Sequence, residues 1–255
     1  MLLEADTGGP KGDGRVLVLL HGMGTTREVW RPLVRVLESE WEGRWIAPDL
    51  RGHGRSPRAR SYSLGEHALD VVETVRAHVP DASMISVLGH SMGGVIALAL
   101  GSEWFGLHKL YEVLGLGIKI SWTNEEIAAL RARAGAPAKT FESRDVAIAF
   151  YLKVSGLTGL VAADSEIARA GVSETGLHLA ADPAVASIGP PKMVGLIGAT
   201  GVHRIYLAAG ENDPMCTLGD MRAHDRDAKQ IAGAGHNAMV EAPERVWAWV
   251  KECIG

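Results

Sequence analysis

The feature that most constrains the fold is a single serine placed between a strand and a helix. Residues 84–88 (Met-Ile-Ser-Val-Leu) predict a buried strand, and residues 95–100 (Val-Ile-Ala-Leu-Ala-Leu) predict a helix. Between them stands Gly-His-Ser-Met-Gly, residues 89–93, with Ser91 at its centre. A sharp turn there would hold the serine in a strained backbone conformation, and the glycines remove side chains that would otherwise collide. The pattern predicts a nucleophile elbow and covalent catalysis.

Strands and helices alternate around this turn. Apolar runs predict further strands at residues 16–20, 44–49 and 109–114. Apolar side chains at helical spacing predict helices at residues 26–38, 64–79 and 92–104 (ending at Trp104). Ser63 and Glu66 have the spacing of a capping box at the start of the second helix. The alternation predicts an α/β fold with a doubly wound, mostly parallel sheet.

The pattern changes after the strand at 109–114. From residue 115 to 201, alanine-rich runs predict helices at 124–134, 143–154 and 165–170, and no buried strand is predicted. Strands resume at 204–209 and 227–231, and a final helix follows at 243–253. We therefore predict a core domain, residues 1–114 and 202–255, and a helical cap insertion, residues 115–201, before the last two strands.

The composition excludes several classes of partner. The chain of 255 residues has 26 Lys and Arg against 30 Asp and Glu, a balance that does not indicate a nucleic-acid surface. Cys216 and Cys253 are too few for a disulfide framework, which favours a reducing compartment. No run approaches the roughly 18–20 apolar residues of a membrane span, and no secretory leader is recognisable. We expect a cytoplasmic protein with no nucleic-acid or membrane partner.

A serine hydroxyl needs a base and an orienting acid to become a nucleophile at neutral pH. His236 is the candidate base, because it directly follows the last predicted strand, at the sheet edge where ligands bind. Asp213, in the loop after the strand at 204–209, is the candidate acid. The alternative for Asp213 is a turn residue before Pro214, in which case Glu112 is the fallback acid.

The acyl intermediate also needs hydrogen-bond donors for its developing oxyanion. An elbow supplies one through the backbone N–H after the nucleophile, here Met92. The second is predicted in His-Gly-Met-Gly, residues 21–24, whose glycines permit a tight loop that brings the amide of Met23 to Ser91. His21 is expected to orient this loop and not to transfer protons.

Five motifs together resemble the α/β-hydrolase superfamily. They are Gly-His-Ser-Met-Gly at 89–93, His-Gly-Met-Gly at 21–24, Asp-Leu-Arg-Gly-His-Gly-Arg-Ser at 49–56, Gly-Glu-Asn-Asp-Pro at 210–214 and Gly-His-Asn at 235–237. The resemblance covers everything except residues 115–201, which correspond in position to the cap that such enzymes insert between their sixth and seventh strands. It implies that Ser91, Asp213 and His236 form a catalytic triad, and it implies no cofactor.

Three further expectations follow from the resemblance and the motifs. Arg51, His53 and Arg55 have a structural role in a turn near the sheet. A serine at the elbow argues against the haloalkane dehalogenase and epoxide hydrolase branches, which have an aspartate there. No metal-ligand pattern such as His-Glu-x-x-His is present, and Cys216 is interpreted as a small buried thiol.

The predicted function is hydrolysis of a small-molecule carboxylic ester or lactone through an acyl-enzyme. The same triad can also hydrolyse carbon–carbon bonds or transfer acyl groups, and a non-catalytic receptor of this fold is a further alternative. A homo-oligomer is possible. Several residues of the insertion are open to lining a pocket or packing between helices, and no site role is assigned to them: Trp122, Phe141, Phe150, Tyr151, Leu152 and Met193.

Overall fold

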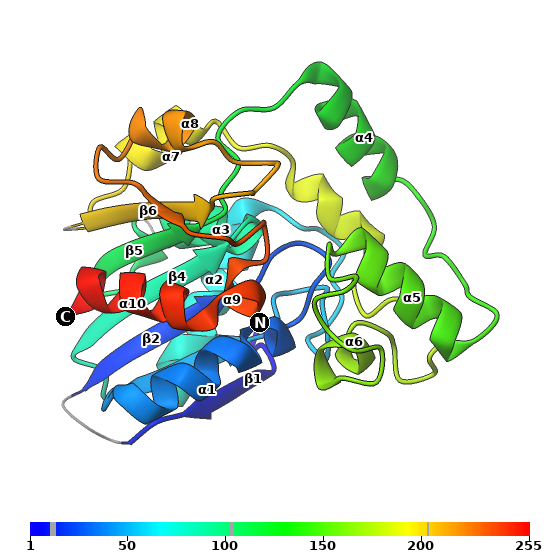
Figure 1. Cartoon of the computed structure of the whole chain (residues 1–255), viewed down its shortest axis with the longest axis horizontal. Helices are drawn as coiled ribbons and strands as arrows, with labels where there is room; N and C mark the ends of the chain where they lie inside the picture. Colours follow the sequence, from blue (N-terminus) through cyan, green and yellow to red (C-terminus); the bar gives the residue numbers. More distant parts are fainter. Residues whose placement is uncertain (11–13, 103–104, 203) are drawn as a thin grey trace.

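The computed structural model describes residues 1–10, 14–102, 105–202 and 204–255, which form a seven-stranded sheet flanked by helices (Figure 1). The strand order is β1-β3-β2-β4-β5-β6-β7. The strands are β1 (Ala5–Gly8), β2 (Arg15–Leu20), β3 (Arg44–Pro48), β4 (Met84–His90), β5 (Leu110–Leu116), β6 (Arg204–Gly210) and β7 (Lys229–Ile231). Only β1 pairs antiparallel within this sheet, at its edge against β3. The predicted α/β fold with a doubly wound, mostly parallel sheet is confirmed.

Helices cover both faces of the sheet, as the apolar runs of the strands require. One face packs against α2 (Leu64–His78) and α3 (Met92–Leu100), and the other against α1 (Arg31–Glu40) and α10 (Pro243–Ile254). In β2, Val16, Val18 and Leu20 belong to the first core, whereas Leu17 and Leu19 belong to the second. This alternation places the end of the central strands between two packed layers, so the loops that follow them have a rigid base.

The segment between β5 and β6 is helical. It contains α4 (Asn124–Ala134), α5 (Arg144–Val154), α6 (Glu166–Ala170), the 3-10 helix η3 (Pro183–Ile188) and α7 (Met193–Gly198). Figure 1 places α4, α5 and α6 to one side of the sheet. β5 runs to Leu116, two residues beyond the predicted end of this strand at residue 114. The division into a core and a cap stays a prediction.

The remaining elements are η1 (Arg27–Trp30), α8 (Leu218–Arg222) and α9 (Ala238–Glu241). Across the described parts of the chain, every helix is too short or too polar to cross a membrane. The capping box of Ser63 and Glu66 is present at the start of α2, with both of its hydrogen bonds.

Two predicted elements differ from the structure, and one observed strand was not predicted. The sequence analysis missed β1, a short strand whose residues are mostly half-buried. The predicted helix at 26–38 begins as the 3-10 helix η1, and α1 starts only at Arg31, where Pro32 occupies the first turn. The helix predicted to end at Trp104 ends at Leu100, because the chain turns at Gly101 to meet Gly201; Trp104 itself lies outside the described residues.

Candidate active site

The elbow holds Ser91 in a conformation that L-residues rarely adopt. Its φ is 51° and its ψ is −118°, between the last residue of β4 and the first of α3. A methyl group on Gly89 would lie 2.3 Å from the carbonyl oxygen of Gly93, and one on Gly93 would lie 2.2 Å from that of Leu20. These approaches leave no room for side chains, so the turn can form only with glycine on either side of the serine. The strain and the glycine requirement are those of the predicted elbow.

Asp213 and His236 form a hydrogen-bonded pair, although 23 residues separate them. The Nδ1 of His236 lies 2.8 Å from Oδ2 of Asp213, whose side chain is fully buried. Burial raises the pKa of Asp213, but the hydrogen bond and charge of His236 and the N–H of Met215 outweigh it and hold the pKa below its ordinary value. The ionised carboxylate of Asp213 therefore accepts a hydrogen bond from the Nδ1–H of His236, which leaves Nε2 of His236 outside this bond.

Hydrogen bonds from residues on either side of His236 hold its loop in place. The carboxylate of Glu241 accepts the backbone N–H groups of Gly235 and Asn237, at 2.7 and 3.1 Å. The buried amide of Asn237 donates to the carbonyls of Ser155 and Gly156, which connects the loop to the segment between β5 and β6. The sequence analysis assigned no role to these residues.

His90 supports the same loop from the elbow. Its Nε2 donates to the backbone carbonyl of His236 at 2.9 Å, and the two rings lie 4.6 Å apart. Burial, and then the neighbouring His236, lower the pKa of His90 to about 3, so this ring is neutral. His90 thus ties the elbow to the candidate base.

The loop at residues 21–24 is held by two buried histidines. His21 accepts the N–H of Leu50 with Nε2 and donates from Nδ1 to the carbonyl of Gly22, both at 2.9 Å. His53 accepts the N–H of Gly24 with Nε2 at 3.0 Å. Burial lowers the pKa of His21 to about 4 and that of His53 to about 3. Both rings are therefore neutral and fully used in hydrogen bonds, which is a structural role.

The turn at residues 49–56 is built from buried ion pairs. Asp49 accepts the guanidinium and the backbone N–H of Arg27 as well as the N–H of Arg55. Arg51 makes two hydrogen bonds to Asp70, at 2.6 and 3.0 Å. These contacts fix the turn against β3 and α2, and they position His53 against the loop at 21–24.

Ser91 and His236 line one cavity of about 660 Å³. Met23 and Met92, the predicted sources of the oxyanion donors, line it too, and Asp213 lies behind His236. Of the six insertion residues left open above, Trp122 alone lines this cavity within the described structure. Part of the wall is apolar and solvent-exposed, formed by Val154, Leu160 and Met215.

One neighbour of the pair went unrecognised in the sequence. Gly117 has a φ of 63°, and a methyl group there would lie 3.3 Å from both Asp213 Oδ2 and His236 Nδ1. The fallback acid Glu112 lies near the start of β5 and accepts a hydrogen bond from Ser86 at 2.7 Å. It is therefore at the opposite end of the strand from the candidate site.

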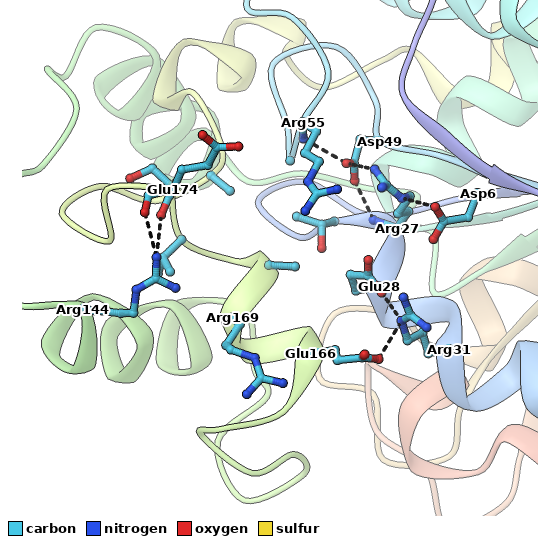
Figure 2. Close-up of a pocket in the computed structure, with 16 residues that line it drawn as sticks. Asp6, Arg27, Glu28, Arg31, Asp49, Arg55, Arg144, Glu166, Arg169 and Glu174 are labelled. Carbon is cyan, nitrogen blue, oxygen red and sulfur yellow. Dashed lines mark hydrogen bonds and ion pairs between the residues drawn. The ribbon is translucent and has the colours of Figure 1, made fainter.

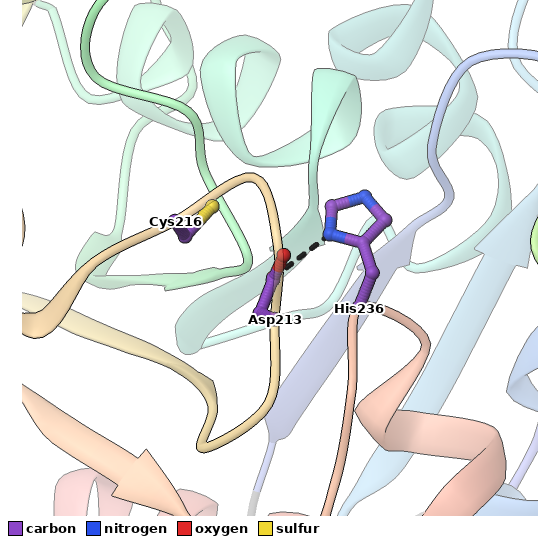
Figure 3. A group of neighbouring side chains, drawn as sticks. All are labelled: Asp213, Cys216 and His236. Carbon is purple, nitrogen blue, oxygen red and sulfur yellow. Dashed lines mark hydrogen bonds and ion pairs between the residues drawn. The ribbon is translucent and has the colours of Figure 1, made fainter.

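Asp213, Cys216 and His236 lie close enough together to resemble a metal-ligand set (Figure 3). Burial, and then the charge and hydrogen bond of Asp213, raise the pKa of the Cys216 thiol. The thiol is thus held protonated, and a metal needs the thiolate. Since His236 also engages Asp213 through Nδ1, the donor set fits a hydrogen-bonded group better than a metal site.

A second cavity, of about 590 Å³, lies between η1 and α6 (Figure 2). Its walls carry charges of both signs, and most are paired. Arg27 contacts Asp6 and Asp49, and Arg31 contacts Glu28 and Glu166. This cavity is separate from Ser91 and His236 and contains no nucleophile with a base beside it among the described residues.

Curated proteins resemble this chain over part of its length. Protein phosphatase methylesterase 1 of Bos taurus is 31% identical over 163 residues, which are 59% of this chain and 40% of that protein. The magnesium-chelatase 30 kDa subunit of Rhodobacter capsulatus is 39% identical over 100 residues, 38% of this chain and 33% of that protein. The aligned region therefore spans less than half the length of these two relatives.

Solved structures share the fold. An esterase of Thermogutta terrifontis superposes with a TM-score of 0.73 at 22% identity, covering 99% of this chain and 92% of that one. E-2-(acetamidomethylene)succinate hydrolase gives 0.76 at 21% identity, covering 99% and 94%. A model of the alpha/beta hydrolase family matches residues 17–249. The protein therefore belongs to the alpha/beta hydrolase family.

Proposed function

We propose that the protein hydrolyses a small-molecule carboxylic ester or lactone through an acyl-enzyme formed on Ser91. The observation that carries this proposal is the hydrogen-bonded pair of Asp213 and His236, which lies at the same cavity as a serine held at φ 51°. A strained elbow lifts the hydroxyl toward a ligand, and the pair supplies a base with an orienting acid. The methylesterase relative is consistent with ester chemistry.

In the proposed first half-reaction, Oγ of Ser91 attacks the ester carbonyl carbon while Nε2 of His236 takes the hydroxyl proton. The carbonyl π electrons move to oxygen, and the N–H groups of Met92 and Met23 stabilise the oxyanion. As the first residue of α3, Met92 has an N–H without an acceptor inside the helix. The oxyanion then collapses, the alcohol leaves with the proton from His236, and the acyl-enzyme remains.

In the second half-reaction a water molecule gives its proton to His236 and attacks the acyl carbonyl. Collapse of the second oxyanion releases the carboxylic acid and returns the proton to Ser91. Asp213 holds His236 in one tautomer throughout and stabilises the imidazolium that forms in each step. No cofactor enters either step.

The test is covalent labelling with a fluorophosphonate, followed by intact-mass analysis, together with release of p-nitrophenol from short-chain esters. We expect one adduct and ester turnover in the native protein, and neither in Ser91→Ala. Ser39→Ala is the matched control, since Ser39 is exposed near the end of α1 and its hydroxyl donates to the carbonyl of Val36. Unlabelled, inactive native protein that is fully folded would refute the proposal and favour a ligand-binding role.

A further inference from the structure

The cavity that contains Ser91 has an excess of positive charge. The ionisable side chains of its wall, other than histidines, are Lys119, Arg133, Lys153 and Glu241. Lys119 pairs with Glu126, which neutralises it. Glu241 is already occupied by the N–H groups of Gly235 and Asn237. Arg133 and Lys153 therefore supply charge that the wall itself does not balance.

Arg133 is exposed, unlike the buried arginines Arg27 and Arg51, and its partners differ from theirs. Arg27 and Arg51 each bind a buried carboxylate. Arg133, by contrast, has no ion pair and no side-chain hydrogen bond within residues 1–10, 14–102, 105–202 and 204–255. The surrounding protein lowers the pKa of Arg133 through loss of hydration, and no nearby carboxylate raises it again. A guanidinium stays charged under all ordinary conditions, so the five N–H donors of Arg133, which the described residues leave without a carboxylate, are available to an anionic ligand.

The position of Arg133 relates it to the reacting atoms. A methyl group placed on Gly24 would lie 3.3 Å from Nη2 of Arg133. Gly24 follows Met23, the proposed oxyanion donor, so the guanidinium lies against the loop that contacts the reacting carbonyl. Leu130, one turn earlier on α4, lines the same cavity and adds an apolar surface beside the charge. Arg133 remains solvent-accessible, as a group that receives a ligand must be.

From these contacts we propose that the substrate is an anionic ester, one that carries a carboxylate in addition to the scissile ester, and that Arg133 binds this carboxylate. The inference rests on the proposed ester hydrolysis and names its substrate class. Arg–carboxylate pairs are strong because the planar fork matches the two oxygens. The exposed apolar wall then contacts the carbon chain between the carboxylate and the ester.

The kinetic test compares two esters with the same leaving group and the same five-carbon acyl chain. They are mono-p-nitrophenyl glutarate, which ends in a carboxylate, and p-nitrophenyl pentanoate, which ends in a methyl group. We expect the native protein to favour the glutarate ester in kcat/KM by at least about tenfold, as a charge-assisted pair can supply. Arg133→Gln should lose about 10- to 100-fold on the glutarate ester and less than about threefold on the pentanoate ester.

Two further variants separate charge from structure. Arg133→Lys keeps the charge without the fork and should fall between the native protein and Arg133→Gln on the anionic ester. Arg131→Gln is the matched control, because Arg131 is exposed on the same helix and does not line the cavity. Equal losses on both esters in Arg133→Gln would overturn the inference, since Arg133 would then act on the oxyanion or on the fold. A native protein without preference for the anionic ester would overturn it too.

A binding measurement keeps the inference independent of turnover. In Ser91→Ala, isothermal titration with sodium glutarate, against sodium chloride at equal ionic strength, should show saturable binding that the added Arg133→Gln substitution weakens by about tenfold or more. Absence of such binding contradicts the role of Arg133. Failure of fluorophosphonate labelling contradicts the catalytic proposal alone, so the two failures are distinguishable.

Discussion

Four buried histidines predict that the fold is unusually sensitive to mild acid. They are His21, His53, His67 and His90, and burial is the largest cause of the lowered pKa of each. The pKa is lowered to about 4 for His21 and to about 3 for the others. Lowering the pH from 7.5 to 5 therefore tests whether these buried rings stay neutral at the expense of stability.

The sign and the size follow from proton linkage. In the unfolded chain a histidine titrates at about 6.5, so at pH 5 it binds nearly one proton, whereas the buried ring binds almost none. The contribution of each histidine to stability is thus complete above pH 6.5 and is lost as the pH falls toward the folded-state pKa. Between pH 7.5 and 5 the loss is about 2 kcal/mol for each ring, or about 8 kcal/mol for four independent rings. A loss of that size is comparable with the whole free energy of unfolding of an ordinary domain, about 5–15 kcal/mol.

The assay is urea unfolding, followed by tryptophan fluorescence, at a series of pH values. Near pH 5.5 the free energy of unfolding should fall by about 5 kcal/mol per pH unit. His53→Gln keeps an acceptor for Gly24 and a donor for the carbonyl of Arg51, so it should reduce that slope by about a quarter. His108→Gln, at an exposed histidine, controls for the substitution itself. A free energy of unfolding that stays constant within about 1 kcal/mol from pH 7.5 to 5.5 would refute the reasoning.

Three substitutions, two of them paired with a control substitution, test the elbow and the acid. Ser91→Gly should raise the free energy of unfolding by about 1 kcal/mol, because glycine tolerates φ 51°, and it should abolish turnover because the hydroxyl is lost. A lower midpoint of thermal unfolding would contradict this. Gly93→Ala should lower the free energy of unfolding by more than about 3 kcal/mol, since the new methyl group would meet a backbone oxygen of β2. Its control, Gly195→Ala, lies in open space on α7 and should raise the free energy of unfolding by about 0.5–1 kcal/mol. Equal unfolding midpoints of the two variants would be inconsistent with the close packing at Gly93. In ester assays, Asp213→Asn should lower kcat/KM by about 10³- to 10⁴-fold, because it removes the acceptor for Nδ1–H of His236. Its control, Glu112→Gln, should lower kcat/KM by less than about threefold. Comparable losses in the two variants would contradict the proposed role of Asp213.

The sequence predicted those parts of the candidate site that depend on local order along the chain. Ser91 directly follows β4, and Asp213 and His236 lie in the loops that follow β6 and β7. The carboxyl ends of parallel strands meet at one edge of a sheet. Their convergence on one place therefore requires only that the strands be recognised. The need for glycines at the elbow was predictable too, because the geometry of that turn is determined within five residues.

Contacts between distant segments were beyond sequence reasoning. The N–H of Gly24 donates to His53, and the N–H of Gly235 donates to Glu241. The side-chain amide of Asn237 donates to the carbonyl of Ser155. These partners are determined only when the loops pack. The position of Arg133 depends on how α4 packs beside the cavity, which the periodicity of the helix does not predict. β1 was missed because four mostly polar residues carry no apolar alternation, and its antiparallel pairing with β3 supplies the stability that its composition lacks.

The helix α4 has a consequence for how this protein can diversify. None of its described residues is buried, and its main neighbour is η3. Side chains there can be exchanged at little cost in stability, since neither face fills a core. The elbow, in contrast, tolerates almost no change. With the proposed role of Arg133, selection for a new substrate charge, in nature or in a library, would act on α4 alone while Ser91, Asp213 and His236 stay as they are.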